Sequence, residues 1–532
     1  MLSGAGARVN PTLVESREVM DVPERFNAAA FFVDRHVADG RGGRTAFRFA
    51  GREVTYTELA ERVDRAAGVL ASSGVEIENR VLLVLDDTPA FAAAFWGAVK
   101  LGAVAVPVNT LMAPGEYEFF LNDSRARVAV VEERLAEKLA QVRPRCPWLR
   151  AVLVPADLVA GTPSEVEGGP RQLPGAAATC GEDIMYWGYT SGSTGRPKAA
   201  LHSHQDFVAA AELVGAGVFG IGADDLIFSA SKLYFAFGLG NALYFPALVG
   251  AASVLVPERI TPELAFEVIA AERPTIFFAV PTLYARMLQV PDAERVWDLS
   301  SLRYCVSSGE ALPTAIFDAW ADRFGLELVE VVGSTEALHD FIANRPGKAR
   351  RGAAGQVIPG FETKLVDDAG QPVPLATVGH LLVKGPTTAL SYWNRLERTR
   401  TTMLGEWLRT GDMFSQDADG FFTFAGRADD MLKVGGVWVS PTEVEGRLVE
   451  HPAVLEAAVV GRADETGLTK VHASVVLKDM RLAGERFADE LRRFVKERMA
   501  ASGTPHWIEF VPELPKTATG KIQRFRLRSG RQ

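Results

Sequence analysis

The stretch Tyr189-Thr190-Ser191-Gly192-Ser193-Thr194-Gly195-Arg196-Pro197-Lys198 is a run of small hydroxyl residues and glycines that ends in a lysine. Glycines let the backbone approach an anion closely. Successive N–H groups and hydroxyls can surround phosphate oxygens, and a lysine adds a point charge. A Gly/Ser-rich surface loop is the alternative interpretation. The order of the residues, directly after the apolar segment 184–187, favours a loop that binds a triphosphate.

This loop differs from a Walker A loop, in which Gly-Lys-Ser/Thr opens a helix. Here Pro197 precedes Lys198 and Ala199 follows it. We therefore predict a different kind of phosphate site. Its expected contact residues are Thr190, Ser191, Gly192, Ser193, Thr194, Gly195 and Lys198.

On both sides of the loop, short apolar segments alternate with segments of helical pattern. Segments 80–85 and 104–108 precede the loop, and segments 226–230 and 275–280 follow it. Continuous apolar strands that alternate with helices indicate a parallel sheet covered on both faces. The chain becomes richer in strands after residue 361, and a smaller unit of strands and helices follows Gly426. We therefore expect an α/β protein with more than one domain.

Two local features test this interpretation. Residues 45–49 and 54–56 predict a hairpin around Gly51, and Thr57 is the expected N-cap of a helix over 58–73. Residues 233–257 carry no charge and are long enough to cross a bilayer. Because this span contains several glycines and prolines, we expect a loop, a buried helix and a core strand rather than a membrane helix.

The composition excludes several classes of protein. Fifty-seven basic against 66 acidic residues give a net charge of −9, which argues against a nucleic-acid binder. Cys146, Cys180 and Cys305 are far apart in the sequence, so neither a zinc knuckle nor a disulfide framework is indicated. The first residues lack the apolar segment of a signal peptide. We expect a cytoplasmic protein that binds neither nucleic acid nor membrane.

Four further motifs carry polar groups with a chemical use. Residues 331–336, Val-Val-Gly-Ser-Thr-Glu, place two hydroxyls and a carboxylate after a predicted strand, which suits a nucleotide and Mg²⁺. The same residues would also start a helix. Residues 407–412 end in Asp412, whose carboxylate can accept hydrogen bonds from ribose hydroxyls. Residues 424–433 and 515–522 combine charges with small residues, and either could be a solvated turn.

These five motifs, in order from Tyr189 to Lys521, resemble those of the adenylate-forming (ANL) superfamily, which contains acyl- and aryl-CoA ligases, luciferases and peptide-synthetase adenylation domains. The resemblance covers essentially the whole chain. It implies a large N-terminal domain, residues 1–428, of layered sheets with covering helices and a strand-rich subdomain. It also implies a small mobile C-terminal α+β domain, residues 429–532, that pivots at Asp429.

The resemblance also assigns roles to residues. Thr335 would contact the α-phosphate, and Glu336 would hold Mg²⁺. Lys521 would neutralise charge as the acid attacks, and Lys433 would reach the site in the thioester-forming conformation. Val332 stands where many members carry tyrosine. Further ATP contacts are expected at Ser308, Gly309, Glu310, Val331, Val332, Gly333, Ser334, Asp412, Phe424 and Arg427, and hinge or CoA contacts at Asp429, Gly435, Gly436 and Trp438.

Three segments, 22–29, 232–241 and 334–341, resemble benzoate-type CoA ligases in particular. Aromatic side chains beside small residues suit a flat ring, although either phenylalanine alone could be an ordinary core residue. The expected aryl-acid contacts are Phe235, Ala236, Phe237, Gly238, Gly333, His339 and Asp340.

Asp340 departs from the benzoate-type pattern, which has an aliphatic residue after the histidine. A carboxylate beside an apolar pocket is costly unless it is paired. Our hypothesis is that Asp340 accepts a hydrogen bond from a ring substituent, such as the amino group of 2-aminobenzoate or a hydroxyl. The alternatives are that it points to solvent or pairs with an arginine.

The resemblance therefore predicts an ATP-, Mg²⁺- and CoA-dependent ligase for benzoate or a substituted benzoate, which acts through an aryl-AMP and releases AMP and pyrophosphate. One alternative is a stand-alone adenylation enzyme that loads a carrier protein supplied in trans. Another is a catalytically silent nucleotide-binding scaffold. The sequence leaves the oligomeric state open, with a homodimer as one alternative, and it does not fix the ring substituent.

Overall fold

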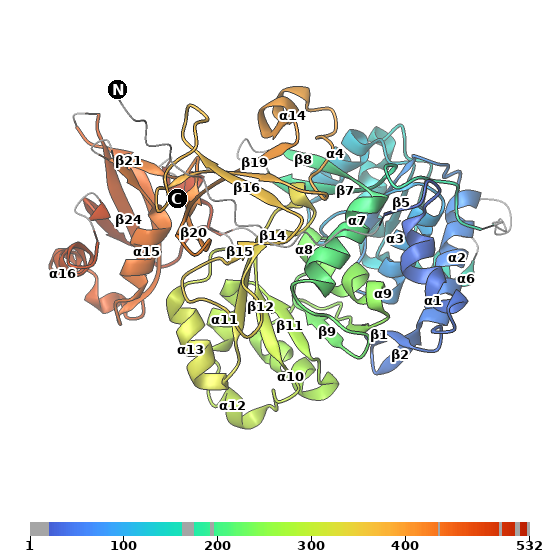
Figure 1. Cartoon of the computed structure of the whole chain (residues 1–532), viewed down its shortest axis with the longest axis horizontal. Coiled ribbons are helices and arrows are strands. Elements are labelled where there is room, and N and C mark those ends of the chain that lie inside the picture. The colour runs from blue at the N-terminus through green and yellow to red at the C-terminus, as the bar shows by residue number, and fades with distance from the viewer. Residues whose placement is uncertain are drawn as a thin grey trace, which may run out of the picture.

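The computed structural model describes residues 21–161, 175–191, 196–434, 437–465, 467–499, 503–516 and 522–528. Figure 1 shows the C-terminal unit with β24, α15 and α16 at one end of the molecule, and the N-terminal helices α1, α2 and α3 at the other. The strand-rich segment that contains β16 and β19 lies between them. The arrangement is the layered α/β architecture that the sequence predicts.

The first sheet carries the phosphate loop. Its order is β6-β5-β3-β4-β7-β8, parallel except for the final β7–β8 hairpin. The strands are Arg80–Val84 (β3), Val104–Pro107 (β4), Val128–Val131 (β5), Ala151–Leu153 (β6), Ile184–Ser191 (β7) and Pro197–Ser203 (β8). Thr190 pairs with Lys198 in the hairpin, so the loop is the tip of two paired strands.

The second sheet has nine strands in the order β15-β14-β13-β12-β11-β9-β10-β1-β2. Its centre is parallel, as predicted, and its two edges are antiparallel. The strands are Thr45–Phe49 (β1), Arg52–Thr55 (β2), Leu226–Ser229 (β9), Ala252–Val254 (β10), Ile276–Ala279 (β11), Tyr304–Ser307 (β12), Leu328–Gly333 (β13), Asp340–Ala343 (β14) and Gln356–Val357 (β15).

Three smaller sheets follow in the described residues. The third sheet is antiparallel and consists of Glu362–Val366 (β16), Gly379–Lys384 (β17), Met403–Leu404 (β18), Trp407–Gln416 (β19) and Phe422–Arg427 (β20). The hairpin of Leu432–Val434 (β21) and Val437–Val439 (β22) leads to the C-terminal sheet, which consists of Val454–Ala463 (β23), Thr469–Leu477 (β24) and Trp507–Phe510 (β25).

Helices cover these sheets. They are Arg35–Ala38 (α1), Tyr56–Ser72 (α2), Pro89–Lys100 (α3), Pro114–Ser124 (α4), Ala136–Val142 (α5), Pro155–Ala160 (α6), His204–Ala210 (α7), Ala236–Leu239 (α8), Phe245–Val249 (α9), Pro262–Glu272 (α10), Pro281–Met287 (α11), Ala293–Val296 (α12), Thr314–Phe324 (α13), Leu396–Thr402 (α14), Pro441–Val449 (α15), Glu485–Lys496 (α16) and Arg524–Arg528 (α17). Several begin at a proline, which is tolerated at the first helical position.

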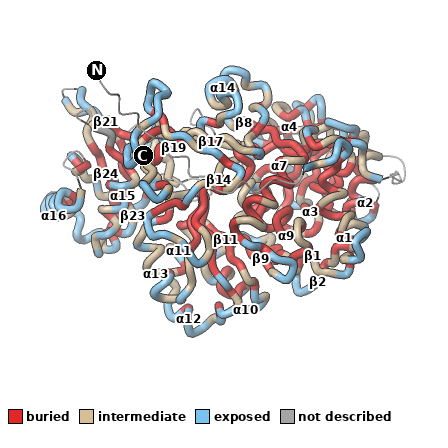
Figure 2. Tube along the Cα trace, viewed as in Figure 1, coloured by how far each residue is buried: buried red, intermediate tan, exposed pale blue. Residues whose placement is uncertain are grey.

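The buried residues form several clusters, of which the largest joins three sheets and another lies in the C-terminal unit. The large core joins the first three sheets through side chains such as Val81, Phe278 and Phe414. The C-terminal sheet packs instead against α15 and α16 through its own cluster, which includes Val444 and Leu491. Figure 2 shows the buried, red trace concentrated in the sheets and their facing helices.

Two local predictions can be compared directly with the structure. The hairpin around Gly51 is confirmed. The predicted N-cap Thr57 is wrong, because the helix begins at Tyr56 and Thr55 caps it. The Thr55 hydroxyl accepts from Glu58 N, and the Glu58 carboxylate accepts from Thr55 N. This reciprocal capping box stabilises the earlier start.

The uncharged span 233–257 folds as a loop, α8, the π-helical segment Gly240–Tyr244 (η5), α9 and strand β10. In the part of the chain that the structure describes, no helix is long and apolar enough to cross a membrane. The expectation of a loop, a buried helix and a core strand is confirmed.

Candidate active site

The stem of the predicted phosphate loop is fixed on both sides. The Tyr189 hydroxyl donates to Asp123 Oδ2 at 2.8 Å, and Asp123 Oδ1 accepts from Arg395 at 3.0 Å. The Trp187 and Trp393 rings contact each other with centroids 4.6 Å apart and planes tilted by 37°. Burial, and then the charge of Asp123, raise the pKa of Tyr189, so the phenol stays a neutral donor. The loop therefore leaves a rigid base.

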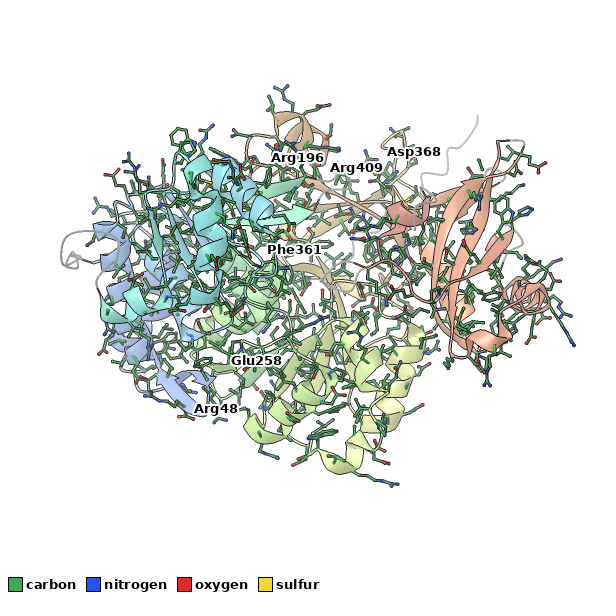
Figure 3. The ribbon with its side chains drawn as sticks, turned by 180° about the vertical axis from the view of Figure 1, so that it is seen from behind. Arg48, Arg196, Glu258, Phe361, Asp368 and Arg409 are labelled. Atoms are coloured by element: carbon green, nitrogen blue, oxygen red, sulfur yellow. The ribbon has the colours of Figure 1, made fainter. Side chains whose placement is uncertain are left out.

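The tip of the loop lies outside the described residues. This applies to Gly192, Ser193, Thr194 and Gly195, and to the Ser191 side chain, so their predicted phosphate contacts stay predictions. Arg196, just beyond the tip, is exposed and lies in the upper part of the molecule in Figure 3, whereas Phe361 is buried and lies nearer the middle.

The structure brings Lys198 and Glu336 together and adds a residue that the sequence analysis did not identify, Tyr392. Nζ of Lys198 is 3.1 Å from Oε1 of Glu336 and donates to the Tyr392 hydroxyl at 2.5 Å. That hydroxyl donates to the same Oε1 at 2.6 Å. Tyr392 is buried. Its position just before α14 gave no signal in the sequence.

The surroundings of Glu336 keep its carboxylate ionised. Burial opposes the charge, but the Lys198 ammonium and the Tyr392 hydroxyl outweigh it, so the pKa of Glu336 is lowered. An ionised carboxylate is a suitable Mg²⁺ ligand. In the described ranges no group of three or more His, Cys, Asp or Glu side chains could hold a metal. The single ionised carboxylate of Glu336 fits an Mg²⁺ ion that takes its other ligands from phosphate oxygens and water.

Hydrogen bonds to its own backbone hold the Ser-Thr-Glu segment in place. Nε2 of His202, on β8, donates to the Thr335 carbonyl at 2.7 Å. The Glu336 carbonyl accepts from Ala389 N at 2.7 Å. Ser334 also caps the short helical turn that follows it. The motif therefore starts a helical turn, as the alternative interpretation expected, and also places Glu336 beside Lys198.

Gly188 on β7 allows the same segment to approach the first sheet. A Cβ at Gly188 would lie 2.5 Å from Cγ2 of Thr335 and 2.9 Å from the Tyr186 hydroxyl. Neither Gly188 nor His202 was identified from the sequence. Both act through the Thr335 backbone or side chain, which a linear motif does not reveal.

Asp412 and Arg427 are brought together by the third sheet. They face each other across the β19–β20 pair, and Nη1 of Arg427 lies 2.9 Å from Oδ1 of Asp412. The charge of Asp412 raises the pKa of Arg427, with a smaller contribution from Glu336. Strand β20 also carries Phe424, whose ring centroid is 5.2 Å from that of Phe414 on β19.

The predicted adenine segment follows β12. Gly309 has φ of +88°, which glycine adopts readily, and the Thr282 hydroxyl approaches Glu310 Oε2 at 3.5 Å. The neighbouring strand β13 carries Val331, Val332 and Gly333. It also carries Glu330, which the sequence analysis missed: burial raises the pKa of Glu330 to about 8, although Leu312 N donates to its Oε1. A single carboxylate inside an apolar strand was the available signal.

The aromatic residues of the predicted acid pocket separate into two groups. The Phe237 ring centroid lies 5.5 Å from that of His339, and Phe245 lies 4.5 Å from His339 on another side. Phe235 instead contacts Tyr234 at 4.7 Å and is 36% exposed. The structure thus brings Phe237, and not Phe235, against His339.

Three glycines keep this region closely packed. A Cβ at Gly238 would lie 2.2 Å from the Lys232 carbonyl, and one at Gly240 would lie 2.4 Å from Cδ2 of His339. A Cβ at Gly333 would lie 2.6 Å from Oδ1 of Asp340. Ala236 begins α8 beside them.

Asp340 is only 2% exposed. The two alternative positions, in solvent or paired with an arginine, are therefore wrong: its Oδ2 lies 2.9 Å from Nδ1 of His339, and the Ser308 hydroxyl donates weakly to its Oδ1 at 3.4 Å. The strand β14 begins at Asp340 and turns its side chain inward beside Gly333.

The predicted hinge and lysine residues are only partly described. Lys433 and Trp438 pair in the β21–β22 hairpin, but their side chains, Gly435, Gly436 and Lys521 lie outside the described residues. Asp429 precedes that hairpin. The predicted CoA and lysine contacts therefore stay predictions.

The two sides of the lysine loop are fastened to the C-terminal unit. Nζ of Lys516 lies 2.6 Å from Glu456 Oε1. Beyond the loop, Nη2 of Arg524 lies 2.7 Å from Glu445 Oε2, and its Nη1 lies 3.7 Å from Asp430 Oδ2.

Comparisons with known proteins find relatives that match along most of the chain. The model of the AMP-binding enzyme family matches residues 34–393, and that of the AMP-binding enzyme C-terminal domain matches residues 443–521. A benzoate–CoA ligase of Thauera aromatica is 44% identical over 510 residues, which are 96% of this chain and 97% of that protein. A 4-hydroxybenzoate–CoA/benzoate–CoA ligase of Rhodopseudomonas palustris is 43% identical and covers 94% of each chain.

Solved structures are similar as well. The crystal structure of an anthranilate CoA ligase in complex with anthranoyl-AMP has a TM-score of 0.89, 42% identity and coverage of 96% of this chain and 98% of that one. A benzoate CoA ligase from Burkholderia xenovorans LB400 has a TM-score of 0.86 at 42% identity, with coverage of 94% and 100%.

Proposed function

Because the chain belongs to the AMP-binding enzyme family, we propose that this site joins an aromatic carboxylic acid to coenzyme A at the expense of ATP. The protein is an AMP-forming acid–CoA ligase of the benzoate type, and its reaction passes through an aryl-AMP. ATP and CoA are its co-substrates. The position of the Phe237–His339 wall next to the Lys198–Tyr392–Glu336 cluster carries this proposal, because residues 333–340 connect the two.

In the first half-reaction, an oxygen of the aryl carboxylate attacks the α-phosphorus of ATP, and pyrophosphate leaves. Lys198 and the phosphate loop hold the β- and γ-phosphates, and Thr335 contacts the α-phosphate. Lys521 lowers the charge repulsion between the two anions. Glu336 would hold Mg²⁺, which would supply positive charge against the phosphates. Asp412 accepts hydrogen bonds from the ribose hydroxyls. Nη1 of Arg427, 2.9 Å from Oδ1 of Asp412, orients this carboxylate.

In the second half-reaction, the thiol of CoA loses its proton and its sulfur attacks the acyl carbon, which releases AMP. We place the domain boundary at Asp429. Residues 429–532 then rotate about this residue, so that Lys521 leaves the active site and Lys433 enters it. The separate hydrophobic core of the C-terminal unit supports this boundary. Gly435, Gly436 and Trp438 would border the thiol.

A direct assay tests the proposal. Purified protein with MgATP, CoA and a panel of benzoate, aminobenzoates, hydroxybenzoates, cinnamate and a medium-chain fatty acid should form aryl thioesters and AMP. If no aromatic acid yields AMP, the proposal is wrong. If aryl-AMP forms without any CoA thioester, the second candidate, adenylation for a carrier protein, takes its place.

Three further inferences concern the cellular setting. We place the enzyme in the cytoplasm, because ATP and CoA are supplied there. Its partners are then small molecules, and we propose neither nucleic acid nor membrane as a ligand. A homodimer stays a proposal, which the mass of the protein in solution would test.

A further inference from the structure

A small group of polar atoms beside the aromatic wall is buried without adequate partners. Oδ2 of Asp340, Nδ1 of His339 and the hydroxyl of Tyr244 make no hydrogen bond to any part of the chain that the structure describes. All three side chains are at least nine-tenths buried. Buried polar groups are nearly always hydrogen-bonded, so such a group needs an explanation.

The contact between His339 and Asp340 does not satisfy either atom. Nδ1 and Oδ2 are 2.9 Å apart, but the approach lies off the direction that a hydrogen bond requires, so the bond is not formed. The other ring nitrogen, Nε2, is 3.3 Å from the Phe237 carbonyl. A carbonyl only accepts, so Nε2 carries the hydrogen of that contact, while Nδ1 faces Oδ2 of Asp340 without a hydrogen bond.

Oδ2 of Asp340 is therefore a buried acceptor that finds no donor in the described residues. The hydroxyl of Ser308 reaches only Oδ1 of Asp340, and at 3.4 Å. A hydroxyl substituent offers one donor hydrogen. An aromatic amino group offers two and can donate one to each oxygen of the Asp340 carboxylate.

The position of Asp340 determines which ring position of the aromatic acid would carry the amino group. Asp340 pairs with Gly333 across strands β13 and β14, and its Oδ1 lies against the open face of that glycine. Gly333 is two residues before Thr335, which the proposed function places at the α-phosphate. With Thr335 placed in this way, the Asp340 carboxylate would face the reacting end of the acid, and the ring position that it would reach is the one next to the reacting carboxyl group.

The fold holds these residues in place rather than leaving them adjustable. Gly240 lies so close to the His339 ring that any side chain there would collide with it. Gly240 opens η5, a π-helical segment that also carries Tyr244, and π-helical segments often occur at functional sites. Burial, with a smaller contribution from the charge of Asp340, raises the pKa of Tyr244, so its hydroxyl stays a neutral donor and acceptor.

We propose that the Asp340–His339 pair is a specificity site for an amino group at the 2-position of the ring, so that the preferred acid of this enzyme is 2-aminobenzoate. The inference rests on the proposed function and refines it. Benzoate leaves Oδ2 of Asp340 unpaired in a buried site. A site built to hydrogen-bond a substituent discriminates strongly against the analogue that lacks it.

The test compares kcat/KM for 2-aminobenzoate and benzoate within each protein, so that a loss of folded enzyme cancels from the ratio. The wild-type ratio should be at least about 100 in favour of 2-aminobenzoate. The ratio should fall to within about tenfold of unity in Asp340→Ala and Asp340→Asn. Glu330→Gln, which changes a buried carboxylate on the strand next to β14, is the matched control and should keep the wild-type ratio.

A wild-type ratio near unity, or an undiminished ratio in both Asp340 variants, would overturn the inference while leaving the ligase activity in place. A preference for 3- or 4-aminobenzoate would overturn the placement of the amino group. Absence of AMP formation with every aromatic acid would instead overturn the proposed function, so the two failures are distinguishable.

Discussion

The hydroxyl of Tyr392 donates a hydrogen bond of 2.6 Å to Oε1 of Glu336, although 56 residues separate them. The same hydroxyl accepts from Lys198, whose Nζ also lies 3.9 Å from the centre of the tyrosine ring. One side chain thus links the cation expected at the phosphates to the carboxylate expected at the metal. The contacts of Tyr392 and Lys198 with Glu336 both use Oε1, and they fix the orientation of the carboxylate and hence of its second oxygen.

Tyr392→Phe should weaken the binding of MgATP while leaving the ring in place. A hydrogen bond to a charged group contributes about 1.5–3 kcal/mol, so the Mg²⁺ concentration for half-maximal ATP–pyrophosphate exchange should rise about tenfold or more. Calorimetric titration with MgATP should show the same loss. Thioester formation from synthetic aryl-AMP should be unchanged.

Tyr284→Phe is the matched control. Its hydroxyl donates to the Val306 carbonyl at 2.9 Å in a different part of the core, so its loss should lower the melting temperature without altering the Mg²⁺ dependence. An unaltered Mg²⁺ dependence in Tyr392→Phe would show that the tyrosine has only a packing role.

Lys521→Ala should separate the two half-reactions. Removing the lysine withdraws the charge that the first step needs, so ATP–pyrophosphate exchange should fall by at least about 100-fold. Thioester formation from synthetic aryl-AMP should persist. Lys516→Ala, at the base of the same loop, removes the contact with Glu456 and should affect exchange far less. Equal loss of both half-reactions in Lys521→Ala would contradict the assignment.

Gly188→Ala should displace Thr335. The added methyl would lie 2.5 Å from Cγ2 of Thr335, and a misplacement of about 1 Å can reduce a rate about 100-fold. We expect adenylation to fall by about that factor, as followed by pyrophosphate release. Gly43→Ala, where a Cβ meets nothing within 4 Å, is the control. Normal adenylation in folded Gly188→Ala would refute the proposed placement of Thr335.

Glu330→Gln should alter how stability depends on pH. Burial raises the pKa of Glu330 to about 8 in the folded protein, whereas the unfolded value is about 4.3. The folded state therefore retains a proton that the unfolded state loses, and the wild type loses stability as the pH rises between these values. Denaturant titrations should find the two proteins equally stable near the lower value, and the variant more stable at pH 8. Parallel pH profiles would contradict this explanation.

Much of the architecture could be predicted because it is local. Segments such as 80–85 and 275–280 are continuous apolar runs, and the structure makes them central parallel strands. The N-cap error was also a local matter. Thr55 has glutamate three residues later at Glu58, which completes a capping box, whereas Thr57 has alanine at the same spacing.

The site could be predicted only where one segment carries the chemistry. Lys198, Glu336, Asp412 and Arg427 lie in recognisable motifs, and the structure brings them together in pairs. Tyr392 could not be found in this way, because its significance lies in contacts across 194 and 56 residues of chain. The burial of Asp340 depends on the register of β14 against β13, which a single sequence does not disclose.

The contact between the tilted indoles of Trp187 and Trp393 has an optical consequence. Trp187 is three residues before Thr190 at the phosphate loop, and Trp393 directly follows Tyr392, so the pair spans two of the segments that would grip the triphosphate. Any rearrangement of those segments when nucleotide arrives would alter the overlap of the rings and hence the emission of the pair. The enzyme thus carries a natural fluorophore couple, which could time nucleotide entry in a stopped-flow experiment without an attached dye.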